Sequence, residues 1–249
     1  AEDGIRDYKV TGVQTCALPI SGFLGNRNSK YLVGHAYNAM QAGAQIVRIH
    51  PVDHGESEHL NADFFKATDI SATLELIDEI LNSCPKTSFS LVGFSLGGNI
   101  ALRISQITSH ANLEKVIAIS PVLNPKQAMK AMDTNSTLIN QYFLRKWKKS
   151  IANKQKHFPN LALEECLKLK SLSAITEFFR ARNGEFESLE DLFDDYAICG
   201  SDLSSPLRKT IILSSKDDPC IPIDPLLEIN ANELLDITIT ENGGQIGRA

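Results

Sequence analysis

The sequence has 249 residues, of which 43% are hydrophobic and 22% charged, and a formal net charge of −5. This composition is typical of one soluble globular domain, with or without an insert, and it excludes collagen and wholesale disorder. No stretch approaches the roughly 18 consecutive apolar residues of a membrane-spanning helix. The acidic balance gives no general attraction for nucleic acids, so the expected partner is a small molecule. Five cysteines without CxxC or Cys/His ligand spacing predict neither a zinc site nor a disulfide framework, and indicate a reducing, cytoplasmic compartment.

Both ends of the chain resemble translated laboratory DNA. Written back into codons, residues 1–20 match a common sequencing-library adapter with its index, and residues 245–249 match the reverse complement of the same oligonucleotide. We therefore expect residues 1–20 and 245–249 to be adapter-derived, and residues 21–244 to be a native domain truncated at both ends. The lack of a visible targeting signal then carries no information.

Helical and strand patterns alternate along residues 21–244. Short apolar, β-branched runs separated by amphipathic helices predict an α/β fold with a mainly parallel sheet that is covered by helices on both faces. The predicted strands are Gln45–Ile49, Ser88–Val92, Val116–Ser120, Thr210–Ser214 and Ile237–Thr240, and the predicted helices are Tyr31–Met40, Ile70–Leu81 and a run through Asn99–Ile104.

A long helical insert interrupts this alternation. Residues 122–207 contain no strand pattern and are rich in charge, which predicts an inserted helical cap. The cap has a basic cluster around Trp147 and an acidic stretch later on. Two interpretations stay open: a solvated helix face with an acidic loop, or a patch for anionic head groups or a membrane surface. The basic cluster is Arg145, Lys146, Lys148 and Lys149, and the acidic residues are Glu185, Glu187, Glu190, Asp191, Asp194 and Asp195.

The segment Gly93-Phe94-Ser95-Leu96-Gly97 fits the pattern G-x-S-x-G. It lies where a predicted strand ends and a predicted helix begins, so a sharp turn would hold Ser95 in strained backbone geometry above the sheet. The start of the helix would direct backbone N–H groups toward a reacting oxygen, with the N–H of Leu96 placed to donate. This context predicts Ser95 as a nucleophile; a glycine-rich turn without catalysis is the alternative.

A serine hydroxyl needs a base, and the base needs a carboxylate that orients it. Asp218 follows the strand that ends near Ser214, which is where the acid of this fold is expected, and the neighbouring Asp217 is the alternative. Either carboxylate has a purely structural alternative role in an Asp-Asp-Pro turn.

No histidine stands in the expected position for the base. All six histidines precede Asp218, and none follows Ile237–Thr240. We expect the base to be a histidine lost at the truncation after Gly244. His54 and His59 are interpreted as structural or rim residues, and no role is assigned to the others, which are His35, His50, His110 and His157.

Several segments together resemble the α/β-hydrolase superfamily, in particular its YheT-like, embryogenesis-associated branch. The serine turn is shared by the whole superfamily, whereas the aspartate-histidine segment and the Asp-Asp-Pro turn are typical of the branch. The segments are Gly22-Phe23-Leu24-Gly25, Asn28-Ser29-Lys30-Tyr31, Asp53-His54-Gly55-Glu56-Ser57 with His59-Leu60-Asn61, Gly93–Asn99, Ser120-Pro121 and Asp217-Asp218-Pro219.

The resemblance implies further site residues. The loop after the first strand of such hydrolases supplies a second oxyanion donor, which corresponds to the N–H of Phe23. Ser21 stands where the family often has histidine, and Gly243-Gly244 match the first two residues of a typical Gly-Gly-His ending. The implied activity is hydrolysis of carboxylic esters.

The sequence therefore predicts a serine hydrolase of small acyl esters, with no metal or cofactor and no nucleic-acid partner. Acyl transfer or perhydrolysis on the same catalytic residues is the second prediction. A non-catalytic binding protein that kept the fold is the third, because one fold hosts many activities.

Overall fold

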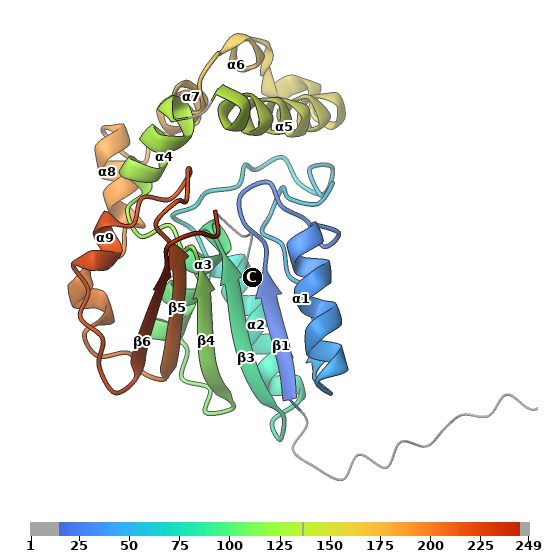
Figure 1. Ribbon diagram of the computed structural model, residues 1–249. Helices are drawn as coiled ribbons and strands as arrows, with labels where there is room; N and C mark the ends of the chain where they lie inside the picture. The colour runs from blue at the N-terminus through green and yellow to red at the C-terminus, as the bar shows by residue number, and fades with distance from the viewer. Residues whose placement is uncertain (1–14, 136, 245–249) are drawn as a thin grey trace, which may run out of the picture.

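Six parallel strands form the centre of the molecule, in the order β2-β1-β3-β4-β5-β6 (Figure 1). The computed structural model describes residues 15–135 and 137–244. The strands are β1 (Thr15–Ile20), β2 (Gln45–Ile46), β3 (Ser88–Phe94), β4 (Leu113–Ile119), β5 (Lys209–Ser215) and β6 (Leu235–Thr240). All five predicted strands are present, which confirms the predicted parallel sheet. The strand expected over Gln45–Ile49 pairs only at its first two residues and again through a bridge at Ile49.

Strand β1 lies inside the sheet, in the segment that the DNA resemblance places outside the native chain. Its residues pair in continuous register with Ser88–Gly93 of β3. All residues from Cys16 to Ile20 are apolar and buried, so the segment packs as an interior strand. The folded sheet therefore begins before Ser21, while the origin of residues 1–20 stays a prediction.

Helices pack on both faces of the sheet. Helices α2 (Ser71–Ser83) and α3 (Leu96–Ile107) bury Ile77, Leu81, Ile100 and Ile104 in the main apolar cluster. Helix α1 (Lys30–Gln41) covers the opposite face beside β1, where Leu32 packs in a second cluster with Val92 and Phe94. Because helices cover both faces of β3, its residues from Leu91 to Phe94 are all buried.

The residues between β4 and β5 form a helical cap, as predicted for residues 122–207. In Figure 1 the cap lies over the carboxyl ends of the strands. Its helices are α4 (Pro125–Thr134), α5 (Thr137–His157), α6 (Glu164–Lys168), α7 (Leu172–Asn183) and α8 (Leu189–Asp195), with short 3-10 turns at Pro159–Leu161 and Gly200–Leu203; a further helix, α9 (Asp224–Leu227), lies between β5 and β6.

Buried hydrogen bonds connect both ends of the cap to the core. The side-chain amide of Asn99, in α3, donates hydrogen bonds to the carbonyl oxygens of Val122 at 2.9 Å and Tyr196 at 2.7 Å. These two carbonyls belong to the segments where the chain enters and leaves the cap. Asn99 is fully buried, so this contact fixes both connections against the helix that follows Ser95. Among residues 15–135 and 137–244, no helix combines the length and apolarity needed to span a bilayer.

Candidate active site

Ser95 occupies the sharp turn between β3 and α3. Its backbone has a φ of 54° and a ψ of −117°, a conformation that residues other than glycine rarely adopt. The turn is held by backbone hydrogen bonds: the Ser95 N–H donates to Ile119 O at 2.9 Å, and Ser95 O accepts from the N–H groups of Gly98 and Asn99. The observed geometry is the strand-turn-helix arrangement that the sequence motif predicts.

The glycines on either side of Ser95 are required by close backbone packing. A Cβ at Gly93 would lie 2.1 Å from Gly97 O, and one at Gly97 would lie 2.5 Å from the carbonyl oxygens of both Ile20 and Ser21. Backbone atoms cannot move aside as the end of a flexible side chain can. The lack of a side chain at Gly93 therefore lets β3 approach the first turn of α3, and the lack of one at Gly97 lets that turn pack against the end of β1.

The loop after β1 lies beside Ser95. A Cβ at Gly22 would lie 3.1 Å from Ser95 Cβ and 3.0 Å from Phe94 O. The Gly22 N–H donates to the Tyr31 hydroxyl at 3.0 Å, which fixes this loop against α1. Among the described residues, no acceptor is bonded to the backbone N–H groups of Phe23 and Leu96, the two predicted oxyanion donors.

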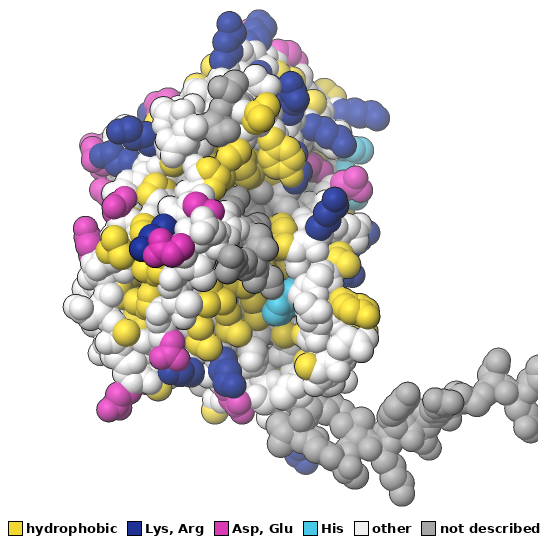
Figure 2. Space-filling model, in the orientation of Figure 1, with side chains coloured by type: hydrophobic (Ala, Val, Ile, Leu, Met, Phe, Trp, Pro, Cys, Tyr) yellow, Lys and Arg dark blue, Asp and Glu magenta, His cyan; other side chains and the backbone are white. Residues whose placement is uncertain are grey.

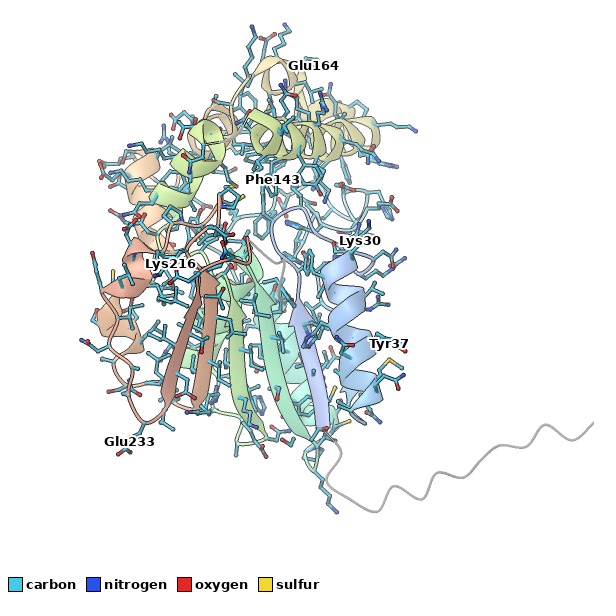
Figure 3. All side chains as sticks on the ribbon, viewed as in Figure 1. Lys30, Tyr37, Phe143, Glu164, Lys216 and Glu233 are labelled. Atoms are coloured by element: carbon cyan, nitrogen blue, oxygen red, sulfur yellow. The ribbon has the colours of Figure 1, made fainter. Side chains whose placement is uncertain are left out.

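A large apolar pocket opens between the cap and the core, and Ser95 is part of its lining. It encloses about 1010 Å³ of space, its open mouth included. Phe23 and Leu96 also line it, so the structure brings three of the four predicted site residues to one cavity. From the cap, Met129, Met132 and Phe143 contribute apolar side chains, and Figure 3 shows Phe143 pointing from α5 toward the sheet.

One feature of this pocket is absent from the sequence predictions: an aromatic wall formed by Phe23, Phe65, Trp147 and Phe179. The rings of Phe23 and Trp147 meet edge to face at 5.0 Å, and those of Trp147 and Phe179 stack at 6.2 Å. Trp147 thus faces inward, although its sequence neighbours are basic. The signal that could have shown this is the spacing of Phe143, Trp147 and Ile151, which places them on one side of a helix.

Asp218 lies in the turn after β5 and is half-buried. Its Oδ1 accepts hydrogen bonds from the N–H groups of Cys220 at 2.8 Å and Ile221 at 2.9 Å, whereas its buried Oδ2 has no hydrogen-bond partner among the described residues. Burial raises the pKa of this carboxyl, and the two backbone N–H groups and the nearby Ser120 hydroxyl partly oppose that effect. A buried carboxylate oxygen without a donor is the arrangement expected where a further donor group belongs.

Asp217 has a different role from Asp218. Its exposed carboxylate accepts hydrogen bonds from the N–H groups of Gly243 and Gly244, both at 2.8 Å, and these bonds lower its pKa. The Ser215 hydroxyl donates to Gly244 O at 2.7 Å. These contacts fix the turn after β6 beside the Asp218 turn. The position after Gly244, where the missing histidine is expected, lies outside the described residues.

None of the six histidines lines the pocket that contains Ser95. His54 is buried beside Phe23 and Phe65, whereas His59 is exposed and contacts Glu56 O through Nδ1 at 3.0 Å. Of the others, His110 lies 3.3 Å from Asp78, and the ring of His157 lies 5.7 Å from that of His59. The described part of the chain also holds no cluster of three His, Cys, Asp or Glu side chains suited to a metal ion.

The acidic stretch of the cap pairs with other lysines rather than with the basic cluster. Glu185 forms an ion pair with Lys66 of the core, and Glu190 with Lys126. Asp191 caps α8 through a hydrogen bond with Ser188. Exposed dark-blue side chains gather over the cap in Figure 2, as expected for a basic helix with a solvated side.

Solved structures that resemble this chain include esterases and other hydrolases. An esterase from Pyrococcus furiosus superposes with a TM-score of 0.60 at 11% identity, over 95% of this chain and 76% of that one. A meta-cleavage product hydrolase from Pseudomonas fluorescens gives 0.59 at 14% identity, over 94% and 85%. α/β hydrolase domain-containing protein 10 from mouse gives 0.53 at 15%, over 92% and 81%.

These likenesses and the parallel sheet with its flanking helices show that the chain has the α/β-hydrolase fold, which confirms the predicted fold class. No protein-family model and no curated protein sequence matches the chain. The YheT-like branch stays a prediction.

Proposed function

We propose that this fold is that of a serine hydrolase of carboxylic esters, with Ser95 as its nucleophile. The observation that carries the proposal is the position of Ser95: a strained turn at the start of a helix, in the lining of an apolar pocket, beside two backbone N–H groups that have no acceptor among the described residues. An apolar pocket suits an acyl chain, and N–H groups at a helix start suit a developing negative charge.

In the proposed reaction the Ser95 hydroxyl oxygen attacks the ester carbonyl while a base takes the hydroxyl proton. The carbonyl oxygen becomes negatively charged and accepts hydrogen bonds from the N–H groups of Leu96 and Phe23. Collapse of this intermediate breaks the ester bond, and the base returns the proton to the departing alcohol. Water then cleaves the acyl-serine ester by the same steps and releases the acid.

We assign the orienting acid to Asp218, with Asp217 as the alternative. The buried, unpartnered Oδ2 of Asp218 supports this choice, whereas Asp217 is already engaged with Gly243 and Gly244. The base would be a histidine that follows Gly244 in the native parent. Since none of the six histidines present lines the pocket, we expect the 249-residue chain itself to have little turnover.

The remaining predictions are part of this proposal. The five free cysteines support a reducing, cytoplasmic compartment. The neighbouring esterases support a small-molecule ester as substrate. Membership of the YheT-like branch and the adapter origin of residues 1–20 and 245–249 depend on the sequence resemblances alone.

The decisive experiment uses a fluorophosphonate probe on the proposed parent, in which a histidine would follow Gly244, and on its Ser95→Ala variant. We expect labelling of the parent at Ser95, none of the variant, and slow labelling of the 249-residue chain. A folded parent that is not labelled at Ser95 would contradict the proposal. A parent without a histidine after Gly244 would support a non-catalytic binding protein, and product formation with alcohol acceptors would support acyl transfer.

A further inference from the structure

A recess lies next to the main pocket, on the other side of the aromatic wall. We call it the side recess. Phe23, Phe65, Trp147 and Phe179 line both cavities. The polar residues of the side recess are Asp53 and His54 from the loop after β2, and Ser150 and Lys154 from α5. None of these four polar residues has a part in the reaction proposed for Ser95.

His54 presents an unused hydrogen-bond acceptor in this recess. Its side chain is buried, with an exposed fraction of 2%, and Nδ1 lies 2.8 Å from Val52 O. Because a carbonyl oxygen only accepts, Nδ1 carries the proton and Nε2 has a free lone pair. Among the described residues, nothing donates to that buried Nε2. Burial, with lesser effects of His50 and Lys146, lowers the pKa of His54 to about 4, so the ring is neutral near pH 7.

Besides His54, the recess contains an ion pair whose charges balance and one hydroxyl that is available to a ligand. The Lys154 ammonium pairs with Asp53 at 2.6 Å and donates to Asn61 O at 3.1 Å and to Asp63 O. These two charges therefore satisfy each other. The Ser150 hydroxyl makes no hydrogen bond with any described side chain or carbonyl oxygen. The recess thus offers one acceptor and one hydroxyl inside an aromatic lining, which suits a neutral group that both donates and accepts.

We propose that the side recess is a subsite for a hydroxyl substituent of the substrate. The substrate hydroxyl donates to His54 Nε2 and accepts from the Ser150 hydroxyl, while its carbon chain passes the aromatic wall. This inference rests on the proposed function and narrows the substrate class to esters that carry a hydroxyl in their acyl or alcohol part.

The test uses the fluorescence of Trp147, which is the single tryptophan of the chain and lines both cavities. The Ser95→Ala variant, which cannot form an acyl-serine, is titrated with an unbranched alkyl ester and with its mono-hydroxylated isomers. We expect one isomer to bind about fivefold to tenfold more tightly than the parent ester, the range of one well-placed neutral hydrogen bond.

Substitutions at His54 separate the subsite from general effects on the fold. In the Ser95→Ala background, His54→Leu removes the acceptor and is expected to abolish the preference, whereas His54→Gln supplies an amide oxygen and is expected to retain part of it. His59→Leu, at an exposed histidine outside the recess, is the matched control and should keep the full preference. Urea unfolding of each variant checks its folding.

Equal affinities for all isomers, or a preference that survives in folded His54→Leu, would overturn the subsite and leave a bound water as the partner of Nε2. Because fluorescence measures binding without turnover, this failure leaves the ester hydrolase proposal untouched. A parent that is unlabelled at Ser95 would overturn the hydrolase proposal instead.

Discussion

Lys154 of the cap helix α5 forms an ion pair with Asp53 of the loop after β2, with 2.6 Å between Nζ and Oδ1. The two side chains are only 2% and 10% exposed. Asp53 also accepts the N–H of Phe65 at 2.9 Å through Oδ2 and has a positive φ of 61°. This pair connects the last turn of cap helix α5 to the core, and both of its side chains line the side recess.

Removing one partner of this ion pair should destabilise the fold strongly. Lys154→Met leaves the Asp53 carboxylate buried without its counter-ion, and we expect a loss of about 3–5 kcal/mol in the free energy of unfolding. The double variant Asp53→Asn with Lys154→Met should recover part of that loss. Urea unfolding of the wild type and of both variants measures these changes. Lys168→Met, which breaks an exposed pair with Glu165, is the control and should unfold like the wild type.

Gly97→Ala should destabilise the protein, while Gly34→Ala should stabilise it. Both glycines lie in helices, so alanine brings the same gain in helix propensity, about 0.5–1 kcal/mol. At Gly97 the new Cβ would overlap two backbone carbonyls, whereas at Gly34 nothing lies within 4 Å. We expect a net loss of about 2 kcal/mol or more at Gly97. Thermal unfolding of the pair tests this, and equal melting temperatures would show that the turn relaxes freely.

The two carboxylates after β5 should differ sharply in their effect on catalysis. In the native parent, Asp218→Asn is expected to lower kcat about 10³-fold to 10⁴-fold, because the base loses its orienting acceptor. Asp217→Asn only weakens the hydrogen bonds to Gly243 and Gly244 and should cost less than about tenfold. Ester hydrolysis assays on the two variants measure both effects. The reverse order would assign the acid to Asp217.

The lowered pKa of His54 should make the free energy of unfolding fall as the pH drops from about 6.5 to about 4. The ordinary pKa of histidine is 6.5 and that of folded His54 is about 4, so in this interval the unfolded chain binds a proton that the folded protein does not. The stabilisation is complete above pH 6.5 and is lost as the pH falls to 4, by about 3 kcal/mol.

Urea unfolding of the wild type and His54→Gln at both ends of this range isolates the contribution of His54. The difference between the two proteins should shrink toward low pH. The raised pKa of Asp218 acts in the opposite sense and is common to both proteins. A constant difference would show that His54 titrates normally in the folded state.

The sequence predicted those parts of the fold that depend on local pattern. Ser95 could be located because the glycines around it are adjacent in sequence, and the strands because their apolar runs are short and bounded. The inward position of Trp147 was not predicted, since its basic neighbours suggested a surface cluster. The contact of Asp53 with Lys154 joins distant segments, and no local pattern encodes it. Strand β1 was not predicted because its residues were assigned to foreign DNA.

The backbone conformation of Ser95 implies that stability of the fold and the proposed catalytic activity make opposite demands on this position. Its φ of 54° would be relaxed in glycine, and such strain is worth about 1–3 kcal/mol. Ser95→Gly should therefore raise the free energy of unfolding while removing the hydroxyl. A serine at this strained turn therefore lowers the stability of the fold, and the proposed nucleophilic role of Ser95 supplies a reason for keeping it.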